Sequence, residues 1–239
     1  MNQVKHTGVI GLGAMGLQMA KHMAAKGFDV VGHDISADAT QRAHALKLRV
    51  ADAAAVARHA EVVIVMVATD AQVESAVEGL IGTLARDAVI CIASSVAPDT
   101  CRALATRAAE RGIGVLDTPV VLGQQAADEG RLTIYAGGEA RHLERARPAL
   151  GSFGAQVLHL GPVGTGQIAK TINNMLLWAC MAANFEALTL AKQLGADVRE
   201  GLVSREAAER EYGVVLDVAS GAVDETATAR RRDEMRAKG

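Results

Sequence analysis

Short apolar runs alternate with amphipathic stretches along the first two thirds of the chain. Strands are predicted at residues 9–10, 28–34, 62–67, 89–92, 115–117, 132–136 and 157–160, and residues 62–67 form a continuous apolar run. Continuous apolar runs suit parallel strands that are buried on both faces. Between them, apolar residues recur every three to four positions over residues 14–26, 71–85 and 98–111, which predicts helices. The alternation predicts an α/β fold, a Rossmann-type doubly wound and mostly parallel sheet.

A long helix is predicted to follow the sheet. From Gly166 to Leu194 the chain has no proline and no internal glycine, and apolar residues recur at helical spacing. A helix of 29 residues is ~43 Å long at 1.5 Å per residue, which is typical of an interdomain connector or a subunit interface. We therefore divide the chain into a Rossmann domain (1–163), a long interdomain helix (164–195) and a short, mainly helical C-terminal segment (196–239).

The first predicted helix opens on a glycine-rich turn, Gly11-Leu12-Gly13-Ala14-Met15-Gly16. The first glycine permits the sharp turn, the second lets a pyrophosphate approach the backbone, and the third lets the helix pack closely on the strand. The free amides and the dipole of the helix N-terminus favour phosphate charge. Asp34 ends the second predicted strand, 18 positions after the last glycine. A carboxylate there binds the adenosine ribose and repels a 2′-phosphate, so the pattern predicts a dinucleotide site that prefers NAD to NADP.

Further candidate residues stand at the ends of the other predicted strands. Ligands of open α/β sheets bind at the carboxyl ends of the strands. Gly11, Asp34, Ala68, Ser94 and Asp117 all fall near such ends. We therefore expect Ala68 to belong to the cofactor site together with the glycine-rich turn.

Composition and charge narrow the range of partners. Half of the 239 residues are hydrophobic and only 3% are aromatic, so aliphatic side chains fill the core. The net charge of −2 gives no indication of a nucleic-acid partner. The chain starts without the layout of a signal peptide, and no apolar run approaches the ~20 residues that cross a bilayer. Three cysteines without a CxxC pair and histidines without a ligand-like cluster predict no metal site and a cytoplasmic location.

A second chemical constellation begins the long predicted helix. Lys170 and Asn174 are four residues apart, so they share one face of the helix. Desolvation near a cleft lowers the pKa of a lysine, which can then move a proton to or from a substrate oxygen. The amide of Asn174 can hold either the lysine or the substrate. Taken alone, a lysine in this position is more often a surface residue.

Together these features resemble the β-hydroxyacid dehydrogenase family, which includes 3-hydroxyisobutyrate dehydrogenase and tartronate semialdehyde reductase. The resemblance covers about residues 4–195, and its blocks are Gly11 to Gly16, Ser94-Ser95 with Pro98, Asp117 to Val120, Ala126-Ala127 with Gly130, Gly137-Gly138, and Gly164 to Asn174. In this family a nicotinamide-binding domain is joined by a long helix to an all-helical C-terminal domain. The resemblance implies that Lys170 is the catalytic acid/base, that Asn174 contacts the substrate, and that Ser95 lies near the nicotinamide.

The chain departs from the family pattern at the substrate loop and at its end. The family usually has Asp-Ala-Pro-Val-Ser-Gly-Gly where this chain reads Asp117-Thr118-Pro119-Val120-Val121-Leu122-Gly123. The resemblance makes Val121, Leu122 and Gly123 substrate-binding positions, but Val121 has no hydroxyl and Leu122 adds bulk. A small hydroxy acid loses a hydrogen bond worth ~1.5–3 kcal/mol there, which implies a larger, less polar or differently held substrate. Only 44 residues follow Gly195, so we expect a shortened or divergent C-terminal domain.

The leading interpretation is an NAD-dependent oxidoreductase that transfers a hydride between nicotinamide and a hydroxy acid or related alcohol or carbonyl. Lys170 then handles the proton of the substrate oxygen. An alternative is a dinucleotide-binding protein with little or no turnover, a truncated paralogue or a sensor, which Val121, Leu122 and the short C-terminus favour. A third is a reductase of C=N bonds, which Lys170 disfavours. The excess of apolar residues over what a small second domain buries predicts a homodimer.

Overall fold

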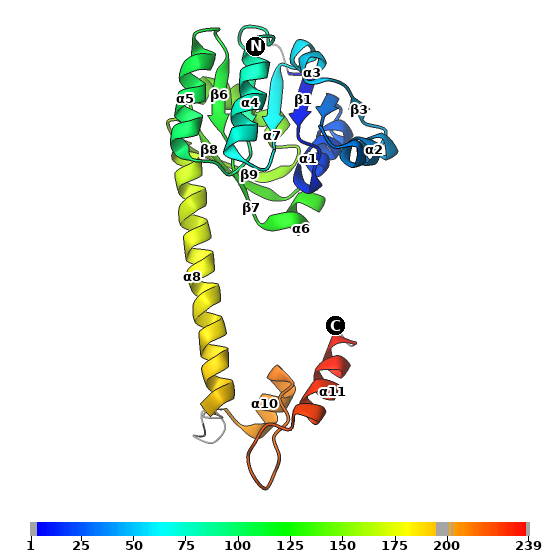
Figure 1. Ribbon diagram of the computed structural model, residues 1–239, viewed down its shortest axis with the longest axis vertical. Helices are drawn as coiled ribbons and strands as arrows, with labels where there is room; N and C mark the ends of the chain where they lie inside the picture. The colour runs from blue at the N-terminus through cyan, green and yellow to red at the C-terminus, as the bar shows by residue number, and fades with distance from the viewer. Residues whose placement is uncertain (1–3, 195–200, 202, 238–239) are drawn as a thin grey trace. The chain divides into compact units, whose positions relative to one another are not determined.

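The structure is a computed structural model that describes residues 4–194, 201 and 203–237 (Figure 1). It divides into two compact units, Met1–Asn174 and Met175–Gly239. The first unit holds the sheet and every residue of the predicted site. The boundary predicted between residues 195 and 196 lies outside the described residues.

The first unit is an α/β fold, as predicted, in which the described residues form a nine-stranded sheet. The strands are β1 (His6–Ile10), β2 (Asp29–His33), β3 (Arg49–Val50), β4 (Val62–Val65), β5 (Val89–Ile92), β6 (Gly114–Asp117), β7 (Val120–Val121), β8 (Leu132–Gly137) and β9 (Gly154–Gly161). The helices are α1 (Ala14–Ala25), α2 (Ala37–Ala45), α3 (Ala53–His59), α4 (Asp70–Ile81), α5 (Pro98–Ala109), α6 (Gly123–Asp128), α7 (Ala140–Leu150) and the start of α8 (Thr165–Leu194), whose later residues belong to the second unit.

The sheet reverses its strand order at β1, which lies between β2 and β4. Parallel pairing runs through β3, β2, β1, β4, β5 and β6, and the antiparallel pairs involve β7 and β8. Strand β9 extends the sheet by pairing in parallel with β8. The carboxyl ends of β1 and β4 therefore meet at a topological switch point, where ligands of such sheets bind.

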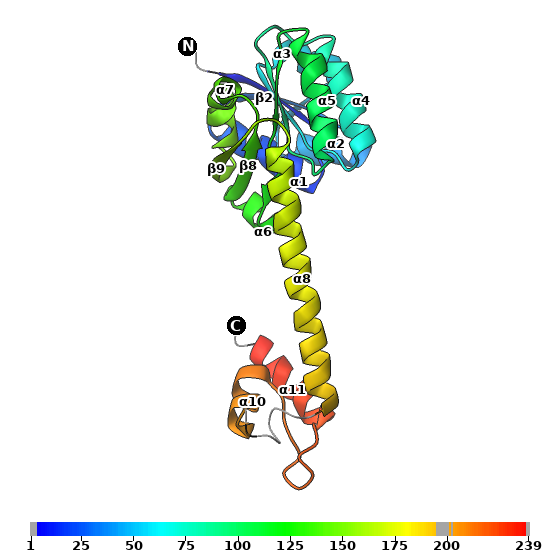
Figure 2. The same ribbon diagram turned by 90° about the vertical axis from the view of Figure 1, so that its left-hand side faces the viewer.

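Two hydrophobic clusters explain why β4 and β5 are apolar at every position. Val62 and Ile64 of β4 pack into the cluster that includes α1 and α7, whereas Val63 and Val65 pack into the one that includes α4 and α5. All four side chains are fully buried. Figure 2 shows α4 and α5 side by side on one face of the sheet. Helices on both faces thus account for the continuous apolar runs.

Several short elements were not predicted, namely α2, β3, α3, β7, α6 and α7. Helix α3 shows the reason, because it is rich in alanine and buries only Val56 and Ala57, which is too few residues to set up a period. The ends of longer elements also differ from the prediction. Helix α4 begins at Asp70, where the Thr69 hydroxyl accepts a hydrogen bond from the Gln72 amide, and it ends at Ile81 instead of residue 85.

The second unit continues from α8 into two short helices, α10 (Arg205–Tyr212) and α11 (Glu225–Arg236). The side chains of Ser204 and Asp224 cap their N-termini. A single antiparallel bridge joins Leu216 and Val223 between them. None of the helices in the described part of the chain combines the length and apolar character that a membrane crossing needs.

Candidate active site

A cleft of about 740 Å³ opens at the carboxyl ends of β1, β2 and β4. Seven of the nine residues predicted to bind the cofactor line it, namely Gly11, Gly13, Ala14, Met15, Gly16, Asp34 and Ala68. The side chain of Leu12 is fully buried behind the turn. Ser95 is exposed on the loop after β5 and is not part of the lining. The structure thus gathers most of the predicted cofactor residues around one cavity.

The glycine-rich turn has the close contacts that only glycine permits. Gly11 has φ +94°, and a Cβ there would overlap the Met66 carbonyl oxygen. A Cβ on Gly16 would overlap the Gly11 carbonyl oxygen, so the third glycine closes the turn. Gly13 has open space where a Cβ would stand, and it is exposed to the cleft. The residues present fit a dinucleotide, because an anion can reach the backbone amides at the start of α1.

Asp34 is held in the cleft by the backbone. Its Oδ2 accepts a hydrogen bond from the Leu12 amide at 2.6 Å, and its Oδ1 accepts one from the Ser36 amide at 2.7 Å. Each oxygen keeps a free lone pair for a sugar hydroxyl. Among the described residues that line the cleft, none is a lysine or an arginine. The cleft therefore has one carboxylate and no fixed cation for an additional phosphate.

The opposite wall of the cleft was missed by the sequence analysis. It is a face of α4 with mostly small residues: Ala71, Gln72, Ser75, Ala76 and Gly79. These positions lie beside the apolar stripe that includes Val73 and Val77, which are buried in the core. The sequence signal that could have identified this wall is a set of small residues at three- to four-residue spacing beside a buried apolar stripe.

Lys170 lies in the second turn of α8, beside the predicted substrate loop. Its Nζ donates a hydrogen bond to the Val120 carbonyl oxygen at 2.7 Å. The side chain is partly buried, and this desolvation lowers the pKa of the amine. Asn174 follows one turn later and is also partly buried. The structure thus brings a perturbed lysine to the loop that includes Val121 to Gly123.

The loop predicted to bind substrate, Val121 to Gly123, is split between the core and the solvent. Val121 pairs with Thr133 in the sheet and is buried. Leu122 is 63% exposed and has φ +85°, in the left-handed region that leucine rarely adopts. Gly123 begins α6 with φ +71° and is exposed. Of the three predicted positions, Leu122 and Gly123 are therefore the ones that face solvent.

Asp117 anchors the start of α8 although it belongs to β6. Its fully buried carboxylate accepts hydrogen bonds from the Gly164 amide at 2.7 Å and from the Gln167 amide at 2.8 Å. These amides at the start of the helix have no partner within it, so the Asp117 side chain caps the N-terminus of α8 although it is distant in sequence. The carboxylate also lies at the positive end of the helix dipole. Asp117 therefore fixes the helix that carries Lys170.

Gln167 connects the same helical turn to the loop after β5. Its side chain is almost completely buried, donates to the Ser94 carbonyl oxygen at 2.8 Å and accepts from the Val96 amide at 3.2 Å. The Ser94 hydroxyl in turn accepts from the Val67 amide at 2.8 Å, and Val67 lines the cleft. Hydrogen bonds thus run from the cleft wall to the turn before Lys170. Sequence reasoning gave Gln167 no role.

Comparison with known proteins places this fold among nicotinamide-dependent dehydrogenases. The family model for the NAD binding domain of 6-phosphogluconate dehydrogenase matches residues 6–161. The NAD-dependent L-serine dehydrogenase of Pseudomonas aeruginosa is 34% identical over 200 residues, which cover 82% of this chain and 67% of that protein. The 3-hydroxyisobutyrate dehydrogenase of the same organism is 39% identical over 192 residues, which cover 79% of this chain and 64% of that protein.

The solved structures agree with the sequence relatives. The 3-hydroxyisobutyrate dehydrogenase of Mycobacterium tuberculosis, solved with L-serine, superposes with a TM-score of 0.77 and 30% identity over 81% of this chain and 67% of that one. The chain therefore spans about two thirds of the length of these relatives.

Proposed function

The chain belongs to the β-hydroxyacid dehydrogenase family, and from that premise we propose that it transfers a hydride between a nicotinamide cofactor and the carbinol carbon of a hydroxy acid, or the corresponding carbonyl. The bound nicotinamide supplies the hydride chemistry. The observation that supports the proposal is the placement of Lys170. Its amine is partly buried and donates a hydrogen bond to the Val120 carbonyl oxygen beside the predicted substrate loop. Hydrogen bonds also connect the start of its helix to the cleft wall.

We propose that Lys170 is the acid/base of the reaction. When an alcohol is oxidised, the neutral amine takes the hydroxyl proton, and in the reverse direction the ammonium returns it. The burial that lowers the pKa of the amine increases its neutral fraction near neutral pH. The carbonyl of Val120 holds Nζ in place at 2.7 Å. Asn174, one turn further along the same helix face, is proposed to orient the substrate oxygen.

We propose NAD as the preferred cofactor because Asp34 is the charged group at the ribose end of the cleft. Its carboxylate repels a 2′-phosphate, and the described lining offers no lysine or arginine to compensate. Asp34→Ala is expected to lower the ratio of the NADP dissociation constant to the NAD dissociation constant, measured by fluorescence titration of the reduced cofactors. An unchanged ratio would show that Asp34 does not discriminate between them.

We propose that the chain forms a homodimer through α8. Among the described side chains of this helix, nine large apolar ones are exposed: Ile168, Ile172, Met175, Leu176, Leu177, Trp178, Met181, Phe185 and Leu188. Exposed apolar surface of this extent marks an association site. Sedimentation velocity is expected to give the dimer at micromolar concentration, and a monomer at that concentration would contradict the proposal.

The enzymatic proposal is tested by NADH absorbance with purified protein. A panel of β-hydroxy acids and the matching semialdehydes and ketones is offered, including substrates larger than hydroxyisobutyrate because Leu122 replaces a glycine of the family pattern. Lys170→Ala is expected to lose at least about 10²-fold in kcat, whereas Lys21→Ala, which removes an exposed lysine on α1, is expected to retain activity. Tight NADH binding without turnover of any substrate would instead favour a cofactor-binding protein with little or no activity.

A further inference from the structure

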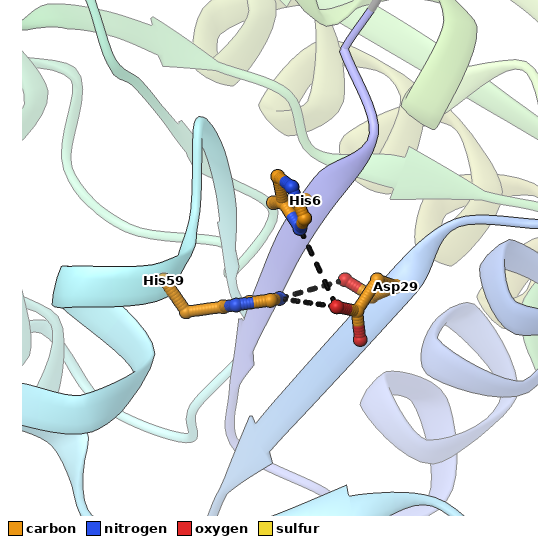
Figure 3. Close-up of side chains that lie close together, drawn as sticks. All are labelled: His6, Asp29 and His59. Atoms are coloured by element: carbon orange, nitrogen blue, oxygen red, sulfur yellow. Dashed lines mark hydrogen bonds and ion pairs between the residues drawn. The ribbon is translucent and has the colours of Figure 1, made fainter.

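Three side chains with metal-binding atoms converge at the edge of the sheet opposite the cleft. His6 begins β1 and Asp29 begins β2, and the parallel register places them directly beside each other. His59 is the last residue of α3. Figure 3 shows both imidazole rings directed toward the Asp29 carboxylate. Strand β1 separates this cluster from Gly11 by about 16 Å, at 3.3 Å per residue, so it is no part of the cofactor site.

The spacing of the three groups matches a metal site. His6 Nδ1 lies 3.4 Å from Asp29 Oδ2, and His59 Nε2 lies 3.5 Å from the same oxygen. The ligand atoms all lie within 4.8 Å of one another. Zinc binds imidazole nitrogen and carboxylate oxygen at about 2.0–2.2 Å, which makes the edge of its ligand tetrahedron about 3.4 Å. Two of the three edges are therefore already at the length that a bound ion requires.

We propose that His6 Nδ1, Asp29 Oδ2 and His59 Nε2 bind one divalent transition-metal ion of the zinc type, with water in the fourth position. Two imidazoles and one carboxylate suit Zn²⁺, Co²⁺ or Ni²⁺ better than the hard cations Mg²⁺ and Ca²⁺, which prefer oxygen ligands alone. Each of the three side chains is partly open to solvent, so an ion reaches the cluster without opening the fold.

The backbone holds His6 and Asp29 in position before any ion arrives, whereas His59 Nε2 lies 3.0 Å from the Asp29 carbonyl oxygen and exchanges that contact for the ion. Strand pairing fixes His6 against Asp29. Glu61 Oε2 accepts hydrogen bonds from the Lys5 and His6 amides at 2.9 and 3.2 Å, which fixes the strand end that carries the first ligand. Sites on strands and helix ends hold their geometry better than sites on loops. A bound ion would join β1, β2 and α3.

Arg49 is the competitor for this site. Its Nη2 lies 3.5 Å from Asp29 Oδ1 and 3.1 Å from both ring nitrogens of His59, so the guanidinium lies against the imidazole face. The cation neutralises Asp29 and opposes a second positive charge. Its side chain is more than half exposed and can leave toward solvent. Removal of this charge should therefore tighten metal binding while all three ligands stay in place.

Calorimetric titration of the metal-stripped full chain with Zn²⁺ tests the proposal, and Co²⁺ absorption reports the coordination number. We expect one equivalent bound at micromolar concentration or below. Asp29→Asn and His59→Ala should each weaken binding at least about tenfold, and Arg49→Ala should strengthen it. His44→Ala and Cys180→Ser, which remove exposed ligand atoms elsewhere, should leave it unchanged.

The outcomes separate this site from fortuitous binding. Saturation only at millimolar Zn²⁺, or the same affinity in wild type, Asp29→Asn and His59→Ala, would overturn the proposal. Circular dichroism checks that these two variants fold. Arg49→Ala retains every ligand, so weaker binding by this variant would contradict the role assigned to Arg49 whatever the other two do. Zn²⁺ should also raise the thermal midpoint of the wild type but not that of Asp29→Asn.

Discussion

Asp117→Asn tests whether a buried carboxylate holds the helix that carries the proposed acid/base. Asp117 is fully buried, and its two oxygens accept the Gly164 and Gln167 amides at 2.7 and 2.8 Å. Asparagine keeps the shape and one acceptor, but its NH₂ group meets the second amide. The variant loses a charge-assisted hydrogen bond, leaves a buried donor unpaired and removes the charge at the helix N-terminus. Together these changes are expected to destabilise the fold by about 3–5 kcal/mol.

Urea unfolding followed by far-ultraviolet circular dichroism measures this loss. With an m-value of about 2–3 kcal/mol/M, the midpoint should fall by about 1–2.5 M. Asp99→Asn is the matched control, because Asp99 is exposed on α5 and pairs with Arg102 only at the surface. Surface pairs contribute about 0–1 kcal/mol, so its midpoint should hardly move. A loss below about 1 kcal/mol for Asp117→Asn would refute the reasoning.

The same variant separates positioning from cofactor binding. Asp117 touches α8 and not the glycine-rich turn, so kcat should fall while the dissociation constant for NADH stays within about twofold. A change confined to NADH affinity would assign Asp117 to the cofactor cleft instead.

Three further predictions follow from single positions. Gly16→Ala, whose Cβ would overlap the Gly11 carbonyl oxygen, should weaken NADH binding at least about tenfold in fluorescence titration, whereas Gly82→Ala, with open space around it, should bind as the wild type does. Leu122→Gly should raise the free energy of unfolding by about 1 kcal/mol, since φ is +85°, and an unchanged thermal midpoint would contradict stored strain. Burial lowers the pKa of Lys170, so the rate of alcohol oxidation should rise with pH as the ammonium loses its proton. The inflection of the pH profile should lie below about 10.4, the pKa of a free lysine. An inflection at or above that pH would contradict the assignment of Lys170 as the base.

The central sheet could be predicted because each of its strands has a recognisable pattern within a few consecutive residues. A strand such as β4 that is buried on both faces must be apolar throughout, and such a run differs from the amphipathic segments on either side of it. Helices α3 and α6 could not be found in this way. They are short and rich in alanine or glutamine, and they bury two residues each, so tertiary packing and not periodicity makes them helical.

The parts of the candidate site also differ in whether a local sequence pattern could reveal them. The glycine-rich turn was recognisable because its three glycines, which permit the turn and the close backbone contacts, all lie within six consecutive residues. The contact between Asp117 and the Gln167 amide spans 50 positions, and no local pattern tells which amide a carboxylate meets. The cluster of His6, Asp29 and His59 was also missed, because it arises from strand register and a helix end and has no ligand spacing in the sequence.

Leu122 bears on whether the departures from the family pattern mean a changed substrate or a lost activity. The backbone there keeps φ at +85°, a conformation that suits glycine and costs leucine about 1–2 kcal/mol. Burial does not offset this cost, since the side chain is 63% exposed. Strain without a packing gain is typical of residues that contact ligands. Val120, two residues earlier, still accepts the hydrogen bond of Lys170 at 2.7 Å. An exposed, strained apolar side chain beside an intact lysine therefore supports a substrate with an apolar group at this position, and argues against a chain that only binds cofactor.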